Sequence, residues 1–214
     1  MTMNAAPGRA AQSQPEGAQS RLLALAEEEI RRIGFRRMRV VAVAEAAGMT
    51  HANVYRYFPS RIALADAVTA AWLKPIETSL SDAATAPDPA IDKLERMILA
   101  LARSYRDRLE GEPDLFALFC DAMEKARPVT RKHRGRVRQL IERVIDEAMG
   151  EGLFEPDARG RALALLFDAM HRFIYPLNVL ADRDAPRARW DRRLANVLDA
   201  ALAAVRGGES RIQA

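Results

Sequence analysis

Apolar residues recur at intervals of three and four positions along most of the chain, and no stretch alternates apolar with polar residues as a half-buried strand does. The first such run is Leu22, Ala26, Ile30 and Ile33, which share one face of a helix. Hydrophobic residues make up 49% of the 214 residues, enough apolar material for a sizeable core. The sequence therefore predicts an all-α globular protein of one or two domains.

Capping residues, glycines and prolines divide this pattern into separate helices. The composition before Ser20 is that of a flexible tail, which we assign to residues 1–18. One helix is expected from Ser20 to Gly34, and another from Arg61 towards Trp72 and Lys74. The remaining expected helices span residues 91–109, 115–125, 130–149, 158–180 with a bend at Pro176, and 187–205.

Two short helices are expected between these, at residues 40–47 and 50–57, joined by a turn at Gly48. This is the helix-turn-helix arrangement, in which one helix fits the major groove of DNA. Helix pairs joined by a glycine turn are also common in other proteins. The pattern alone therefore leaves the function open.

The excess of positive charge lies in the same segment. The whole chain has a net charge of +4, and residues 20–61 hold eight arginines against four glutamates. The rest of the chain carries equal numbers of basic and acidic side chains. This asymmetry indicates a polyanionic partner for residues 20–61, although a basic solvated surface has the same composition.

Individual residues connect this segment to a known family. It contains Gly48-Met49-Thr50, Val54-Tyr55-Arg56-Tyr57-Phe58, Ser60-Arg61 and Leu64, preceded by Gly34-Phe35 and Val43-Ala44-Glu45-Ala46-Ala47. Over about residues 20–66 the chain resembles the tetracycline-repressor (TetR) family of transcription regulators. The resemblance implies a three-helix, helix-turn-helix DNA-binding domain at residues 19–66 and a helical ligand-binding and dimerisation domain at residues 67–214.

The resemblance also assigns individual positions to DNA. The implied DNA-binding residues are Arg39, Thr50, His51, Ala52, Asn53, Tyr55, Arg56, Tyr57 and Arg61. Three of these depart from the family pattern: Arg39 stands where a Ser or Thr usually caps a helix, Ala52 replaces a common glycine, and Arg61 replaces a lysine that contacts the DNA backbone. The implied core residues of this domain are Val43, Ala44, Ala47, Val54 and Phe58.

For the C-terminal part the resemblance implies a dimer interface and an inducer pocket. The apolar stripes expected in a four-helix interface are Leu163, Phe167, Met170, Ile174 and Leu177, and Leu194, Leu198, Ala201, Leu202 and Val205. The candidate pocket residues are Met97, Leu101, Tyr105, Phe116, Phe119, Cys120, Met123, Phe167, Met170 and His171. Such residues are also common in plain cores. No cluster of acids or bases is evident among them, so we expect a small, mostly apolar effector.

We therefore expect a regulator rather than an enzyme: a repressor that binds a palindromic double-stranded DNA operator as a homodimer, needs no cofactor, and is released by a small-molecule effector. The alternative is a helical enzyme or sensor whose helix-turn-helix does not bind DNA specifically.

Cys120 with His133 or His171 could be drawn as a nucleophile and its base, but Cys120 fits a small buried hydrophobe better. The three histidines lack the spacing of metal ligands.

The arginine-rich run from Arg131 to Arg138 is expected to be a solvated helix face, and its alternative is a second patch for nucleic acid. No apolar stretch reaches the length that spans a bilayer, so no membrane partner is expected. The N-terminal residues lack the apolar core of a signal peptide. These features predict a cytoplasmic protein.

Overall fold

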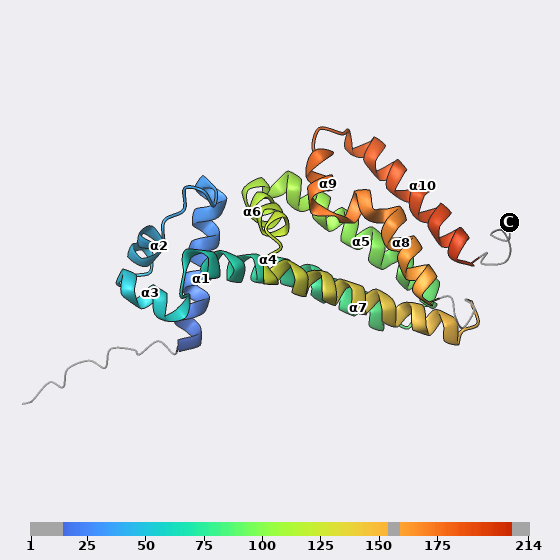
Figure 1. Ribbon diagram of the computed structural model, residues 1–214, viewed down its shortest axis with the longest axis horizontal. Helices are drawn as coiled ribbons and strands as arrows, with labels where there is room; N and C mark the ends of the chain where they lie inside the picture. Colours follow the sequence, from blue (N-terminus) through green and yellow to red (C-terminus); the bar gives the residue numbers. More distant parts are fainter. Residues whose placement is uncertain (1–14, 154–158, 207–214) are drawn as a thin grey trace, which may run out of the picture.

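The computed structural model describes residues 15–153 and 159–206, and every regular element in these two ranges is an α-helix (Figure 1). The all-α fold expected from the sequence is therefore confirmed. The helices in chain order are α1 (Pro15–Ile33), α2 (Val40–Ala46), α3 (His51–Tyr57), α4 (Arg61–Thr85), α5 (Ala90–Gly111), α6 (Pro113–Glu124), α7 (Pro128–Gly150), α8 (Arg159–Ile174), α9 (Pro176–Ala181) and α10 (Arg187–Arg206).

Helix α1 begins earlier than predicted. It starts at Pro15 instead of Ser20, so residues 15–18, assigned above to a flexible tail, belong to the helix. Ala18 is buried four positions before Leu22, so the apolar face continues one turn towards the N-terminus. Proline suits a first turn, because no backbone N–H is needed there. The rest of the predicted tail, residues 1–14, lies outside the described residues.

Helix α4 is longer than predicted, because Pro75 lies inside it instead of near its end. Pro75 is exposed, whereas Ile76 and Leu80 are buried and continue the apolar face towards Thr85. Packing along this face therefore outweighs the local preference of proline to end a helix.

The helix expected at residues 158–180 is broken, not bent, at Pro176. Helix α8 ends at Ile174, Tyr175 adopts an extended backbone, and the short helix α9 starts at Pro176. Proline disfavours helical backbone at the residue before it, and that preference decides the structure here. Helix α9 packs against α5 and α6.

Helices α1, α2 and α3 form a small unit at one end of the molecule (Figure 1). At the end of α2, Gly48 has a φ of +67°, and the N–H groups of Gly48 and Met49 bond back into the last turn of the helix. The Thr50 hydroxyl accepts the backbone N–H of Asn53 and caps α3. The core residues predicted for this unit are all buried, namely Val43, Ala44, Ala47, Val54 and Phe58.

Helix α4 belongs to both parts of the molecule. Its N-terminal end packs on α1, and the rest runs alongside α7 and α5 in the larger unit (Figure 1). The domain boundary predicted between residues 66 and 67 falls inside this helix. The two parts of the chain are therefore joined by a continuous helix and not by a linker.

Ion pairs and hydrogen bonds of charged side chains also connect the three-helix unit to the larger unit. Arg31 of α1 forms an ion pair of 2.5 Å with Glu112, the residue between α5 and α6. The Trp72 indole N–H of α4 donates to the other Glu112 oxygen at 2.7 Å. Arg127, just before α7, binds the Asp66 carboxylate of α4 at 2.7 Å. Each contact reaches α4 or α1 from the larger unit.

The residues expected in the dimer interface mostly pack within one chain. Helices α8 and α10 lie against each other, and their facing sides are already covered. The buried members of the two stripes are Leu163, Met170, Leu194, Leu198, Ala201, Leu202 and Val205. An amphipathic stripe looks the same whether it faces a helix of its own chain or of another. These seven buried side chains are therefore core residues of one chain, whereas an interface role for the half-buried Phe167, Ile174 and Leu177 stays a prediction.

The turn after α2 gives a stability test. We expect Gly48→Ala to lower the free energy of unfolding by about 1–2 kcal/mol, because an alanine Cβ is disfavoured at this left-handed φ. Gly135→Ala is the matched control: it lies inside α7 with no atom within 4 Å of an added Cβ, and should raise the same quantity by about 0.5–1 kcal/mol. Thermal and urea unfolding measure both, and a neutral Gly48→Ala would contradict the assignment.

Candidate DNA-binding surface and ligand pocket

Helix α3 presents one polar face to solvent. Val54 anchors the helix in the core with none of its side chain exposed, and the Thr50 cap fixes its N-terminal end. The exposed side chains of the helix are His51, Ala52, Asn53, Tyr55 and Arg56. The imidazole, amide, phenol and guanidinium groups among them can bond base edges or phosphates. Five of the nine predicted DNA-binding residues thus lie together on one accessible face.

The aromatic residues of α3 differ in exposure. The Tyr55 side chain is exposed and its ring meets His51 edge to face, with 4.7 Å between ring centroids. This contact orients both side chains on the outer face of the helix. Tyr57 is half-buried and packs against the core, so its ring is partly structural.

Several arginines within residues 20–61 are available to a polyanion. Arg31 and Arg32 are occupied by glutamates within and beyond α1. By contrast, four exposed arginines make no side-chain hydrogen bond or ion pair within residues 15–153 and 159–206, namely Arg36, Arg37, Arg39 and Arg56. Arg39 precedes α2 without capping it through its side chain. Its guanidinium therefore stabilises no other group in the described part of the chain.

Arg61 has a structural role in addition to the one implied by resemblance. Its Nε donates to the Met38 carbonyl at 3.0 Å, and one terminal nitrogen donates to the carbonyls of Phe35 and Arg36. The guanidinium also lies over the Phe35 ring, 4.3 Å from its centroid. The Arg61 side chain therefore holds the α1–α2 connection against α4. Its Nη1 takes no part in these bonds and the side chain is half-exposed, so a contact of Arg61 with the DNA backbone stays a prediction.

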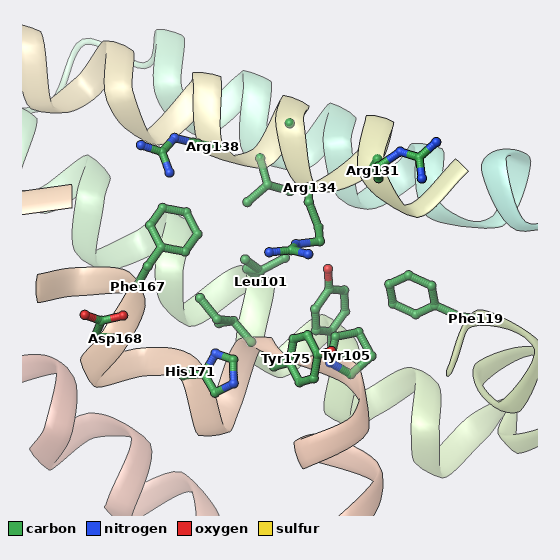
Figure 2. Close-up of a pocket in the computed structure, with 14 residues that line it drawn as sticks. Leu101, Tyr105, Phe119, Arg131, Arg134, Arg138, Phe167, Asp168, His171 and Tyr175 are labelled. Carbon is green, nitrogen blue, oxygen red and sulfur yellow. The ribbon is translucent and has the colours of Figure 1, made fainter. Parts of the chain in front are cut away.

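A pocket of about 440 Å³ opens between α5, α7 and α8 (Figure 2). Its volume lies in the range of small-molecule sites. The predicted pocket residues that line it are Leu101, Tyr105, Phe119, Phe167 and His171. The predicted residues that do not line it are Met97, Phe116, Cys120, Met123 and Met170, which are buried in the core. They point from the same helices towards other neighbours, which helical spacing alone could not separate.

Some lining residues are absent from the sequence prediction. Arg131, Arg134 and Arg138 reach the pocket from α7, and Asp168 and Tyr175 reach it from the α8 side. The three arginines are spaced by three and four residues, so they share one helix face. That spacing was visible in the sequence, but the run was interpreted as a solvated face. The prediction that no cluster of bases borders the pocket is wrong.

Tyr105 connects the pocket wall to α4 through a buried chain of hydrogen bonds. Its hydroxyl lies 2.8 Å from His133 Nε2, and His133 Nδ1 lies 3.0 Å from the Glu77 carboxylate of α4. A carboxylate only accepts, so His133 must donate from Nδ1 and accept the Tyr105 proton at Nε2. Burial lowers the pKa of His133 and outweighs the opposing effect of Glu77, and burial also raises the pKa of Tyr105.

Cys120 is buried, and burial raises the pKa of its thiol to about 12. The thiol therefore carries little thiolate at neutral pH. Within residues 15–153 and 159–206 neither His133 nor His171 forms a hydrogen bond with Cys120, and His133 is engaged with Tyr105 and Glu77. Cys120 behaves as a small buried hydrophobe, as expected from the sequence.

Comparison with known proteins decides the family. Residues 22–68 match the family described as bacterial regulatory proteins, tetR family, and residues 90–198 match the family described as Tetracyclin repressor-like, C-terminal domain. The chain belongs to the TetR family of transcription regulators. Its family and its relatives are transcription regulators and not enzymes, in agreement with the class that the sequence predicts. No helix within residues 15–153 and 159–206 is long and apolar enough to cross a membrane.

Individual TetR-family relatives share part of the sequence or the fold. The HTH-type transcriptional regulator RutR of Escherichia coli K12 is 31% identical over 126 residues, covering 56% of this chain and 55% of RutR. The chain thus matches about half the length of this relative. Among solved structures, the TetR-family repressor FadR of Thermus thermophilus, in complex with lauroyl-CoA, has a TM-score of 0.61 at 19% identity and covers 92% of this chain and 97% of that one.

A second solved structure, SmeT, is the repressor of the Stenotrophomonas maltophilia multidrug efflux pump SmeDEF. It has a TM-score of 0.64 at 16% identity, over 90% of this chain and 90% of its own. At such identities the likeness concerns the fold alone.

The buried histidine gives a pH test. Since folding lowers the pKa of His133 below its ordinary value near 6.5, the folded state binds this proton less well than the unfolded state. The neutral His133 therefore contributes fully to the free energy of unfolding above about pH 6.5. This contribution is lost as the pH falls below that value, and the free energy of unfolding then falls by at most about 1.4 kcal/mol per pH unit. We expect His133→Gln to flatten the loss of stability between pH 7.5 and 5.5 in urea unfolding.

His171→Gln is the control for this experiment, because His171 is an exposed residue outside the Tyr105–His133–Glu77 chain. It should leave the pH profile as steep as in the parent protein. Equal flattening by both substitutions would contradict the role given to His133.

Proposed function

We propose that the chain is a ligand-responsive transcription repressor, with residues 19–66 as its DNA-binding domain and residues 67–214 as its ligand-binding and dimerisation domain. It binds a palindromic operator as a homodimer and is released by a small effector in the pocket between α5, α7 and α8. The observation that carries the proposal is the exposed polar face of α3, in a three-helix unit whose α1 packs on α4, the helix that continues into the unit with the pocket.

In this proposal, the side chains that contact the bases differ from those that contact the phosphates. Asn53 and His51 stand on the first turn of α3, where an amide or imidazole can bond the edge of a base. Arg56 on α3 and Arg39 at the start of α2, the helix that packs against α3, supply charge to phosphates. Phosphates are identical at every step of DNA, so these contacts hold the protein without selecting a sequence.

The effector signal has a physical route to DNA. The pocket wall residue Tyr105 is bonded through His133 to Glu77, and Glu77 lies on the helix that carries the DNA-binding domain. A ligand that shifts α5 or α7 must either move α4 with them or break buried hydrogen bonds, which is costly. Movement of α4 would change the separation of two recognition helices in a dimer.

A dimer would use the outer sides of α8 and α10, since the inner sides are filled by their own chain. These outer sides carry a half-exposed leucine, Leu165, together with small exposed residues, namely Ala164, Ala200, Ala203 and Ala204. Small residues allow two helices to approach closely, and Leu165 supplies apolar area. Two-fold symmetry would present two copies of α3 to a palindrome.

The experiment that tests the proposal is selection of bound DNA from a random pool by the purified protein. A palindrome with half-sites about one helical turn apart supports a dimeric operator-binding protein. An enriched site without symmetry overturns the homodimer. No enrichment overturns the repressor and favours a sensor whose helix-turn-helix does not bind DNA specifically.

Substitutions on α3 and beside it should act differently. We expect Asn53→Ala to relax preference at particular base pairs, by about 1–3 kcal/mol where its amide makes a good base contact. Arg39→Gln should weaken all sequences nearly equally and reduce the salt dependence. Binding profiles over a library of single-base variants of the selected site measure both. A reshaped preference in Arg39→Gln, with uniform weakening in Asn53→Ala, would reverse the two roles.

The interface can be tested by charge. Leu165→Glu should convert the dimer to a monomer at micromolar concentration, because it buries two carboxylates in an apolar contact. Val41→Glu is the control, since Val41 is another exposed apolar residue but lies on α2. Sedimentation equilibrium should then give a dimer for Val41→Glu. A dimeric Leu165→Glu protein would place the interface elsewhere.

A further inference from the structure

We infer that the pocket between α5, α7 and α8 takes an acid with an apolar body of ring size, and that the Arg134 guanidinium binds its anionic group. The inference rests on the proposed function only in treating this pocket as the effector site. It changes the expected effector from a mostly apolar molecule to an amphipathic anion.

Arg134 is the cation best placed to hold an anion. Figure 2 shows its side chain reaching from α7 into the space between α5 and α8, whereas Arg131 and Arg138 lie to either side. Arg131 donates to the Ala126 carbonyl and Arg138 binds Glu142 at 2.8 Å. Arg134 makes no side-chain hydrogen bond or ion pair with any other residue that the structure describes. Its planar set of donors is therefore free for a carboxylate or a phosphate.

Other polar groups on the pocket wall are less suited to an anion. The Tyr105 hydroxyl donates its only proton to His133, so it can offer a ligand nothing but lone pairs. Asp168 repels an anion, but Figure 2 places it beside Phe167, on the side of that ring away from Arg134. Arg138 is paired with Glu142, so Arg131 and Arg134 against this one carboxylate leave the lining positive.

The remaining lining fits an apolar, flat body. Leu101, Phe119, Val137, Phe167 and Ile174 supply aliphatic and aromatic surface. His171 and Tyr175 stack at the pocket edge, with ring centroids 4.7 Å apart and planes 18° from parallel. This pair presents a flat surface on which a ring can stack. A volume of about 440 Å³ accommodates a fused two-ring acid.

The test compares probes of one shape and different charge, measured by calorimetry on the full chain. The probes are 2-naphthoate, its neutral amide 2-naphthamide, the cation 2-naphthylmethylamine, and 2-naphthyl phosphate as a second anion. We expect 2-naphthoate to bind at least about tenfold more tightly than the amide, which is the effect of one charge-assisted hydrogen bond. The ratio between naphthoate and naphthyl phosphate distinguishes a carboxylate from a phosphate ligand.

Variants assign this preference to one side chain. Arg134→Gln should remove the tenfold preference for the acid and leave binding of 2-naphthamide unchanged, and Arg134→Lys should keep part of it. Arg143→Gln is the matched control: the same charge is lost from α7, but outside this pocket. Arg134 is exposed and unpartnered in the described residues, so its variants should unfold at the parent temperature.

Several outcomes would overturn the inference. They are equal binding of acid and amide, a preference for the amine, no binding of either acid at millimolar concentration, or an unchanged preference in Arg134→Gln. Release of the selected operator separates this from the proposed function. If 2-naphthoate binds through Arg134 without weakening operator binding, the anion site stands and the effector role fails. If the amide or the amine binds in the pocket and releases the operator, the effector role stands and the anion assignment fails.

Discussion

The structure depends on one helix, α4, being held simultaneously by the three-helix unit α1–α3 and by the larger unit that contains the pocket. The Glu112 carboxylate is central to this arrangement, because it binds Arg31 of α1 and the Trp72 indole of α4 from the junction of α5 and α6. Burial alone would raise the pKa of Glu112, but the hydrogen bonds from Arg31 and Trp72 and the nearby positive charges hold it below its usual value. The group therefore stays charged, and its attachment to both units persists at neutral pH.

Under the proposed function, this constraint connects the pocket in one part of the chain to the three-helix unit. With a flexible linker the three-helix unit would be independent of movements in the larger unit, whereas a continuous helix couples the two units. Arg61 and Arg127 stiffen the same region, the first by holding the α1–α2 connection and the second by binding Asp66 of α4. The buried Tyr105–His133–Glu77 chain then extends the mechanical connection from α4 to the pocket wall.

Sequence patterns predicted most of the helices and the three-helix unit α1–α3, because periodicity, caps and the Gly48 turn act locally. They failed where neighbours in space decide. Pro75 remained helical because α4 packs along its whole length, and Leu194 and Leu198 proved to be covered by α8 of the same chain. Half of the predicted pocket residues line it, since helical spacing does not tell which side of a buried helix faces a void. The role of Arg61 also needed the carbonyls that the fold brings to it.

The most direct test of α4 as the shared element is the fluorescence of Trp72, which stands where the two units meet. The chain has two tryptophans, and Trp190→Phe leaves Trp72 alone without loss of a hydrogen bond, because the buried Trp190 indole N–H has no partner in the described residues. Saturation of this variant with the selected operator should shift the Trp72 emission, although the indole is buried away from the α3 face. An emission spectrum identical with and without operator would contradict the transmission of binding through α4.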